Sequence, residues 1–193
     1  MTDPLIGDHF GCETLSSMAA QLRDEDRTLV GELVVTCAAL EHIAIIALAI
    51  SMDADFGKVD LAFRRLTHGA VLDTLLRLAP TFLPEGDLLD RWKVWIESAR
   101  EIGRRRNEVV HTIWSSVGPD ELEGLRRGPF RLVRMPRAEM EKLAKDAGDA
   151  MKAGLFVVVD LVNFTRRKDP KHAAMALEAA TDSSDTRTDP VDP

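Results

Sequence analysis

The sequence predicts an all-α fold, an up-and-down bundle of five or six helices with a small β-hairpin after the fifth helix. Three observations support this prediction. Aromatic residues make up only 5% of the 193 residues and tyrosine is absent, so the side chains that favour strands are scarce. Ala, Leu, Glu and Arg, which favour helices, are plentiful. Apolar residues recur at helical spacing, and at 45% of the chain they suffice to bury a core.

Two helices are expected in the N-terminal third. Residues 12–23 carry an amphipathic stripe of Leu15, Met18, Ala19 and Leu22. Residues 27–52 form a second, longer helix that is apolar around nearly its whole circumference in its second half, so we expect it to be the central buried element. This stretch is long enough to cross a bilayer, but Glu41 and His42 near its middle would cost several kcal/mol there. A core helix of a soluble, cytoplasmic protein is therefore the expectation.

Two shorter helices and a long one should follow. The turn residues of segment 52–58 end the second helix. A short third helix is expected over residues 61–66, and a fourth over residues 71–78 is ended by Pro80 and Pro84. Asp87 is the expected N-cap of a fifth helix that runs to about Trp114, which should pack beneath the hairpin.

The last predicted elements are a strand and a sixth helix. Residues 130–134 alternate like a strand of a small hairpin, and Pro136 begins a helix that continues to about residue 165. We expect the buried stripe of that helix to consist of Met140, Leu143, Ala147, Met151, Leu155 and Val158.

The chain is expected to divide into an N-terminal arm (1–11), a helical bundle (12–167) and a disordered tail (168–193). The tail is acidic and rich in Pro, Ser, Thr and Asp. Cys12 and Cys37 are too few and too far apart for a disulfide framework or a cysteine zinc site, and the N-terminus lacks the pattern of a signal peptide. Dinucleotide, P-loop and HExxH motifs are absent, so we expect neither a cofactor nor a metal.

The fifth predicted helix breaks its own apolar pattern at Arg106. On a helical wheel at about 100° per residue, Arg106 falls at the centre of the apolar stripe, and Asn107 and His111 flank it four residues apart on one face. One interpretation is a structural ion pair between Arg106 and Glu41 of the second helix. The other is a partly exposed guanidinium in a cleft that binds an anion.

Positive charge gathers around this helix. Residues 91–137 contain eleven Lys or Arg and six Asp or Glu, a net charge of +5 in a chain whose net charge is −7. Such a concentration of positive charge in an acidic protein indicates a polyanion site. The candidate basic residues are Arg104, Arg105, Arg126, Arg127, Arg131 and Arg134.

The segment Arg106-Asn107-Glu108-Val109-Val110-His111 resembles the R-x(4–6)-H motif of the HEPN superfamily. In those helical domains the motif lies late in a long helix of the bundle, and a small polar residue such as Asn107 often follows the arginine. The resemblance implies a metal-independent endoribonuclease that works as a homodimer. It also implies a role in RNA processing, in phage defence or as a toxin that an antitoxin protein neutralises.

The resemblance assigns a role to each motif residue. His111 would take the proton of a ribose 2′-OH or donate one to the leaving oxygen. Arg106 would neutralise charge that develops on the phosphoryl group, and Asn107 would orient a side chain or hold a phosphate oxygen. The basic residues would bind RNA. Other superfamily members have lost activity, so the alternative is a non-catalytic bundle that binds RNA or a protein partner, with Arg106 in a structural ion pair.

Overall fold

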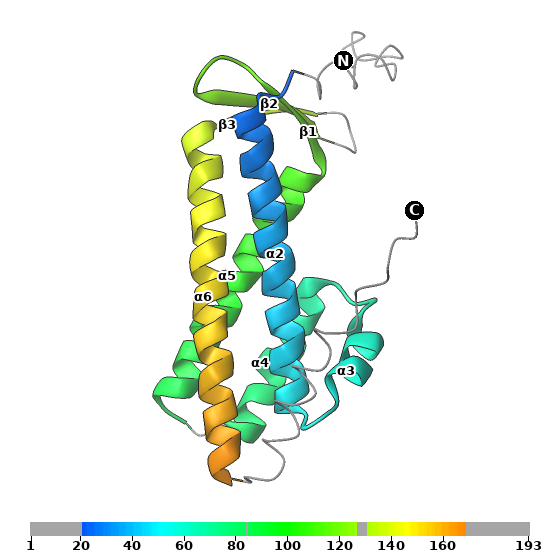
Figure 1. The fold of residues 1–193 in the computed structure, drawn as a ribbon, viewed down its shortest axis with the longest axis vertical. Helices are drawn as coiled ribbons and strands as arrows, with labels where there is room; N and C mark the ends of the chain where they lie inside the picture. The colour runs from blue at the N-terminus through cyan, green and yellow to red at the C-terminus, as the bar shows by residue number, and fades with distance from the viewer. Residues whose placement is uncertain (1–20, 84, 127–130, 169–193) are drawn as a thin grey trace, which may run out of the picture. The chain divides into compact units, whose positions relative to one another are not determined.

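The computed structural model describes residues 21–83, 85–126 and 131–168, and within them the chain is mostly helical (Figure 1). The elements are α2 (Asp24–Ser51), α3 (Phe56–Phe63), α4 (His68–Phe82), α5 (Asp87–Val110), β1 (Thr112–Ser116), β2 (Glu121–Arg126), β3 (Arg131–Pro136) and α6 (Arg137–Lys168). The helical character is confirmed. The small antiparallel sheet predicted after the long fifth helix is present, and it contains three strands in the order β1-β2-β3 where a hairpin has two.

The chain forms two compact units. Among the described residues, the first unit comprises 21–36, 104–126 and 131–146, which include the start of α2, the end of α5, all three strands and the start of α6. The second unit comprises 37–83, 85–103 and 147–168, with α3, α4 and the remainder of the three long helices. The predicted arm (1–11), most of the predicted helix 12–23 and the predicted tail after residue 168 lie outside the described residues. Residues 21–23 of that predicted helix are not helical.

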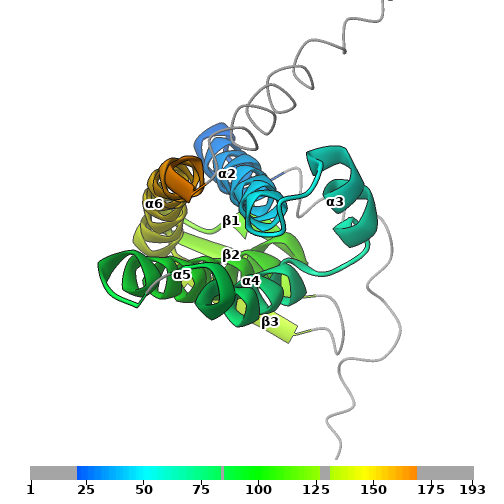
Figure 2. The same ribbon diagram turned by 90° about the horizontal axis from the view of Figure 1, so that it is seen from below.

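The core of the second unit surrounds two tryptophans of α5. Trp92 and Trp95 are buried, with exposed fractions of 0% and 2%, and their rings meet edge to face with centroids 5.7 Å apart. Phe82 of α4 packs on Trp92 in the same way, also at 5.7 Å. Helices α4 and α5 therefore lie side by side (Figure 2), and an ion pair between Asp73 and Arg100 joins them at the surface.

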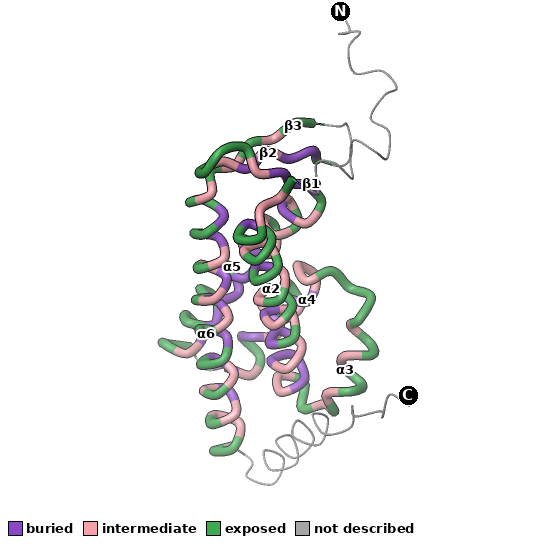
Figure 3. Tube along the Cα trace, turned by 45° about the horizontal axis from the view of Figure 1, so that its top comes forward, coloured by how far each residue is buried: buried purple, intermediate pink, exposed green. Residues whose placement is uncertain are grey.

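The buried stripe of α6 differs from the predicted one in its second half (Figure 3). The buried residues alternate at spacings of three and four, and they are Met140, Leu143, Ala147, Ala150, Gly154, Val157 and Leu161. The prediction is therefore wrong from Met151 onward, and Leu155 is 49% exposed. The physical reason is Gly154. A Cβ atom at Gly154 would lie 2.6 Å from Nε1 of Trp95, so only a glycine lets α6 approach the indole this closely.

The first two described helices begin earlier than predicted. Helix α2 begins at Asp24 rather than at residue 27, and the acidic residues of its first turn interact favourably with the helix dipole. Helix α3 begins at Phe56, inside the segment predicted to be a turn. Asp55 makes this start possible, because its carboxylate accepts a hydrogen bond from the backbone N–H of Lys58 at 3.0 Å.

Helix α4 continues through a predicted stop. Pro80 lies inside α4, which begins at His68 and ends only at Phe82. Proline removes the bond that an N–H at this position would donate to the carbonyl oxygen of Leu76, and the helix continues for only two more residues. The Thr81 hydroxyl donates to the carbonyl oxygen of Leu78 at 2.7 Å in this last turn. Asp87 is the first residue of α5 rather than its N-cap.

Helix α2 is both long and apolar. By length and composition it is the one helix among the described residues that is able to cross a membrane, with a mean hydropathy of 2.3 over an 18-residue window. Half of that window is buried inside the protein. Near its middle, Glu41 is half-buried, while His42 is exposed and meets the ring of Phe56 edge to face at 5.2 Å.

Candidate functional site

The candidate site lies in the first unit, where α5 ends and β1 begins. Helix α5 ends at Val110, and His111 turns the chain into β1, so the predicted helix is four residues too long. Val109, Val110, Thr112 and Ile113 are β-branched, and such residues favour strands over helices. Their side chains explain why the helix stops before Trp114.

Three hydrogen bonds hold this helix end in place. The carbonyl oxygen of Asn107 accepts from the backbone N–H of His111 at 3.2 Å, and that of Glu108 accepts from the Thr112 hydroxyl at 2.7 Å. The indole Nε1–H of Trp114 donates to the carbonyl oxygen of Val109 at 2.9 Å. These bonds satisfy carbonyls that a helix terminus otherwise leaves open. Trp114 is 6% exposed, so it packs beneath the sheet as predicted.

The structure places the three motif residues around the last turn of α5. Arg106 is half-buried, between the buried apolar residues Ile102 and Val109 of the same helix. Its Nη1 donates to Oδ1 of Asn107 at 3.1 Å. The Asn107 and His111 side chains are exposed, one helical turn apart. The pair of Arg106 with Glu41 stays a prediction, since the two residues belong to different units.

The predicted basic residues fall into two groups. Three form ion pairs inside the unit: Arg104 with Glu108 at 2.7 Å, Arg105 with Glu139 at 2.6 Å and Arg134 with Glu123 at 3.2 Å. Arg126 at the end of β2 and Arg131 at the start of β3 are exposed and lie directly opposite each other. Arg127 lies outside the described residues.

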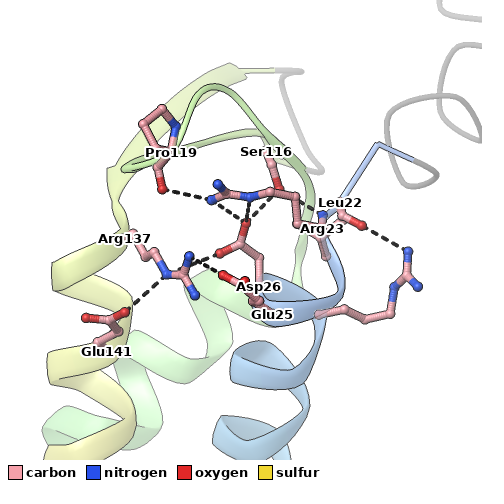
Figure 4. A network of polar contacts seen from close by, with 9 residues as sticks. Leu22, Arg23, Glu25, Asp26, Ser116, Pro119, Arg137 and Glu141 are labelled. Carbon is pink, nitrogen blue, oxygen red and sulfur yellow. Dashed lines mark hydrogen bonds and ion pairs between the residues drawn. The ribbon is translucent and has the colours of Figure 1, made fainter.

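A polar network that the sequence does not predict anchors the sheet next to this site (Figure 4). Asp26 of α2 has no exposed surface, and its carboxylate accepts hydrogen bonds from the Ser116 hydroxyl at 2.7 Å and from Nε of Arg23 at 2.8 Å. Nε of Arg137 lies 3.6 Å from the other carboxylate oxygen. The Ser116 bond joins residues 90 positions apart in the sequence, which is why local patterns give no sign of it.

Arg23 and Arg137 also bind the turn between β1 and β2. Arg23 donates to the carbonyl oxygen of Pro119 at 2.9 Å, and the backbone N–H of Arg137 donates to the carbonyl oxygen of Asp120 at 2.8 Å. The guanidinium of Arg137 also donates to Glu25 at 2.8 Å. The network thus connects the first turn of α2, the β1–β2 turn and the first residue of α6.

Charge and hydrogen bonding set the ionisation of this network. Burial alone would raise the pKa of Asp26, but the hydrogen bonds from Ser116 and Arg23 and the positive charges of Arg23 and Arg137 outweigh burial and lower it. The pKa of Arg137 is raised, chiefly by its hydrogen bond to Glu25. Asp26 is therefore ionised at neutral pH despite its burial.

Two further observations concern ligands and relatives. Within the described ranges, no three His, Cys, Asp or Glu side chains come together in a way that would hold a metal ion. Comparison of the chain with family models, with curated proteins and with solved structures found no match. The case for a function therefore depends on the geometry at the end of α5.

Proposed function

We propose that this protein is a HEPN-like, metal-independent endoribonuclease of the cytoplasm, and that its helices form an up-and-down bundle. The observation that supports this best is the arrangement of Arg106, Asn107 and His111. A guanidinium donates to the amide of Asn107, and that amide and an imidazole face solvent one turn apart. A toxin–antitoxin or phage-defence role, with an antitoxin protein as partner, belongs to the same proposal.

The chemistry needs one proton acceptor and one proton donor. A neutral His111 takes the proton from a ribose 2′-OH, and the 2′-oxygen attacks the adjacent phosphorus. The bond from phosphorus to the 5′-oxygen breaks, and the protonated His111 of the partner subunit donates a proton to that leaving oxygen. The products are a 2′,3′-cyclic phosphate and a 5′-hydroxyl. Arg106 stabilises the charge that accumulates on the phosphoryl oxygens, and Asn107 keeps the guanidinium oriented.

A homodimer would supply the two imidazoles. In the second unit, exposed apolar side chains form a patch on α6 that consists of Leu155, Phe156 and Val159. Phe156 is 70% exposed, which is unusual for a phenylalanine of a monomeric soluble protein. We propose that this α6 patch is part of the dimer interface.

Substitution of His111 tests the proposal. We expect His111→Ala to lower the rate of cleavage of single-stranded RNA, measured with excess chelator, by at least about 100-fold. Since the side chain is exposed, the free energy of unfolding should change by less than about 0.5 kcal/mol. His42→Ala is the matched control, because His42 is also an exposed histidine but lies in the other unit. Undiminished cleavage by His111→Ala would contradict the catalytic assignment.

A second candidate function is a non-catalytic helical protein that binds RNA or a protein partner. The ion pairs of Arg104, Arg105 and Arg134 favour it, because carboxylates already neutralise much of the predicted basic surface. The same assay separates the two functions. A non-catalytic protein retards RNA in a gel without cutting it, and His111→Ala leaves that binding unchanged.

A further inference from the structure

The end of the sheet next to His111 carries two arginines side by side. In the register of β2 and β3, Arg126 lies directly opposite Arg131, so both side chains project from the same face of the sheet. Both are exposed. Within residues 21–83, 85–126 and 131–168, neither side chain forms a hydrogen bond or an ion pair. The backbones of Arg126 and Arg131 thus lie about 5 Å apart, and neither guanidinium has a counter-ion from the described residues.

This pairing contrasts with the rest of the same two strands. Three positions further along β3, Arg134 lies opposite Glu123, and the two form an ion pair at 3.2 Å. Directly opposed like charges destabilise a sheet, whereas opposed unlike charges stabilise it. The repulsion between Arg126 and Arg131 disappears when an anion lies between them. Two opposed, exposed guanidinium groups can both donate hydrogen bonds to one oxyanion, which would also place a negative charge between them.

The register also fixes where this site lies relative to the motif. Arg126 is opposite Thr112, the residue that directly follows His111. The Thr112 hydroxyl is bonded to the last turn of α5, so this strand pair is held against the helix end that carries His111. Arg126 therefore lies one strand spacing from β1, roughly 5 Å, and Arg131 lies two spacings from it, roughly 10 Å.

We propose that Arg126 and Arg131 form an arginine clamp for a phosphate that neighbours the scissile phosphate of the RNA. The proposal rests on the proposed nuclease function and specifies its substrate class. The substrate is an RNA with at least one phosphate beyond the scissile one. A ribodinucleoside monophosphate has no second phosphate and leaves the clamp empty. Arg104, Arg105 and Arg134, which carboxylates already engage, contribute far less to binding.

The first experiment measures cleavage. The ratio kcat/KM is compared for a ribodinucleoside monophosphate and for trinucleotides that add one phosphate on the 5′ or on the 3′ side. Arg126→Gln and Arg131→Gln should each lower kcat/KM about tenfold on the trinucleotide that reaches the clamp and leave it unchanged on the dinucleotide. Arg134→Gln is the matched control on the same strand and should lower neither value by more than about twofold.

The second experiment does not depend on cleavage. Binding of a ten-nucleotide single-stranded RNA to His111→Ala protein is measured as a function of salt concentration, with and without Arg126→Gln and Arg131→Gln. Loss of the arginine contact to one phosphate should weaken binding and reduce the slope of log K against log salt by about 0.7. Removal of the repulsion should leave the melting temperature of the free protein equal or higher, which shows that the variants are folded.

The outcomes distinguish the two proposals. Equal affinity and an equal salt slope in the double variant would overturn the clamp, whether or not the wild-type protein cleaves RNA. An equally large loss in Arg134→Gln would overturn it too, because binding would then come from a diffuse basic surface. Weakened binding in a protein that never cleaves RNA would support the clamp and overturn the nuclease.

Discussion

Asp26 is a carboxylate without exposed surface, held by a serine and two arginines from three parts of the chain. Ser116 is the last residue of β1, Arg23 directly precedes α2, and Arg137 is the first residue of α6. An ionised buried group is tolerated only where such partners compensate for the lost hydration. The ionised carboxylate therefore holds the end of β1 against the first turns of α2 and α6.

Replacement of Asp26 should weaken the fold in a pH-dependent way. We expect Asp26→Asn to lower the free energy of unfolding by about 1.5–3 kcal/mol at pH 7, because hydrogen bonds to a charged group are lost. Because the pKa of Asp26 is lowered in the folded state, its contribution is present above the ordinary value of 3.8 and disappears as the pH falls through the folded pKa. The measurement is urea unfolding of both proteins between pH 7 and pH 3.

The control for this prediction is Asp24→Asn, two residues earlier on the same helix. The Asp24 side chain is 95% exposed and pairs with Arg27 at 3.0 Å, so its loss should change stability by less than about 0.5 kcal/mol. The role assigned to Asp26 is wrong if the two variants are equally stable. It is also wrong if the difference in free energy of unfolding between Asp26→Asn and wild type grows on acidification.

At the scale of an element, α6 shows how one glycine decides which residues a helix buries. Gly154 lets the helix pass against the indole of Trp95, and this approach fixes the rotation of α6 about its axis in the second unit. Leu155, Phe156 and Val159 are exposed as a consequence. Hydrophobicity and spacing alone favour burial of Met151, Leu155 and Val158 over that of Gly154, which is why the predicted stripe is wrong beyond Ala147.

Two glycines of α6 should respond to alanine in opposite directions. Gly154→Ala should destabilise the protein by about 1–3 kcal/mol, because its Cβ would meet a buried indole that has no room to move. Gly148→Ala is the matched control on the same helix. Apart from the neighbouring backbone of α6 itself, no atom of the described residues lies within 4 Å of a Cβ atom at Gly148, so alanine should stabilise the helix by roughly 0.5–1 kcal/mol. Thermal unfolding followed by circular dichroism measures both, and a neutral Gly154→Ala would show that the contact is not tight.

For the whole molecule, the exposed patch on α6 predicts self-association. Phe156→Glu places a charge in the patch and should convert a dimer into a monomer in analytical ultracentrifugation, because a charge in an apolar interface is costly. Leu61→Glu is the control, since Leu61 of α3 is 68% exposed but lies outside the patch. A dimer that survives Phe156→Glu would place the interface elsewhere.

The sequence predicts most helices because periodic apolar residues and caps are local signals. It fails where contacts between residues far apart in the sequence determine which side chains an element buries and how it is anchored. The stripe of α6 depends on Trp95 of α5, and the end of β1 depends on Asp26 of α2. At the candidate site, the spacing of Asn107 and His111 is local and was predictable. The opposition of Arg126 and Arg131 requires the strand register, which the sequence does not reveal.

The three tryptophans are divided between the two units. Trp92 and Trp95 lie in the core of the second unit, and Trp114 is bonded to the helix end beside His111 in the first. Each half of the protein therefore contains its own intrinsic fluorophore. Emission from Trp114 alone reports whether the first unit loosens before the second unit melts.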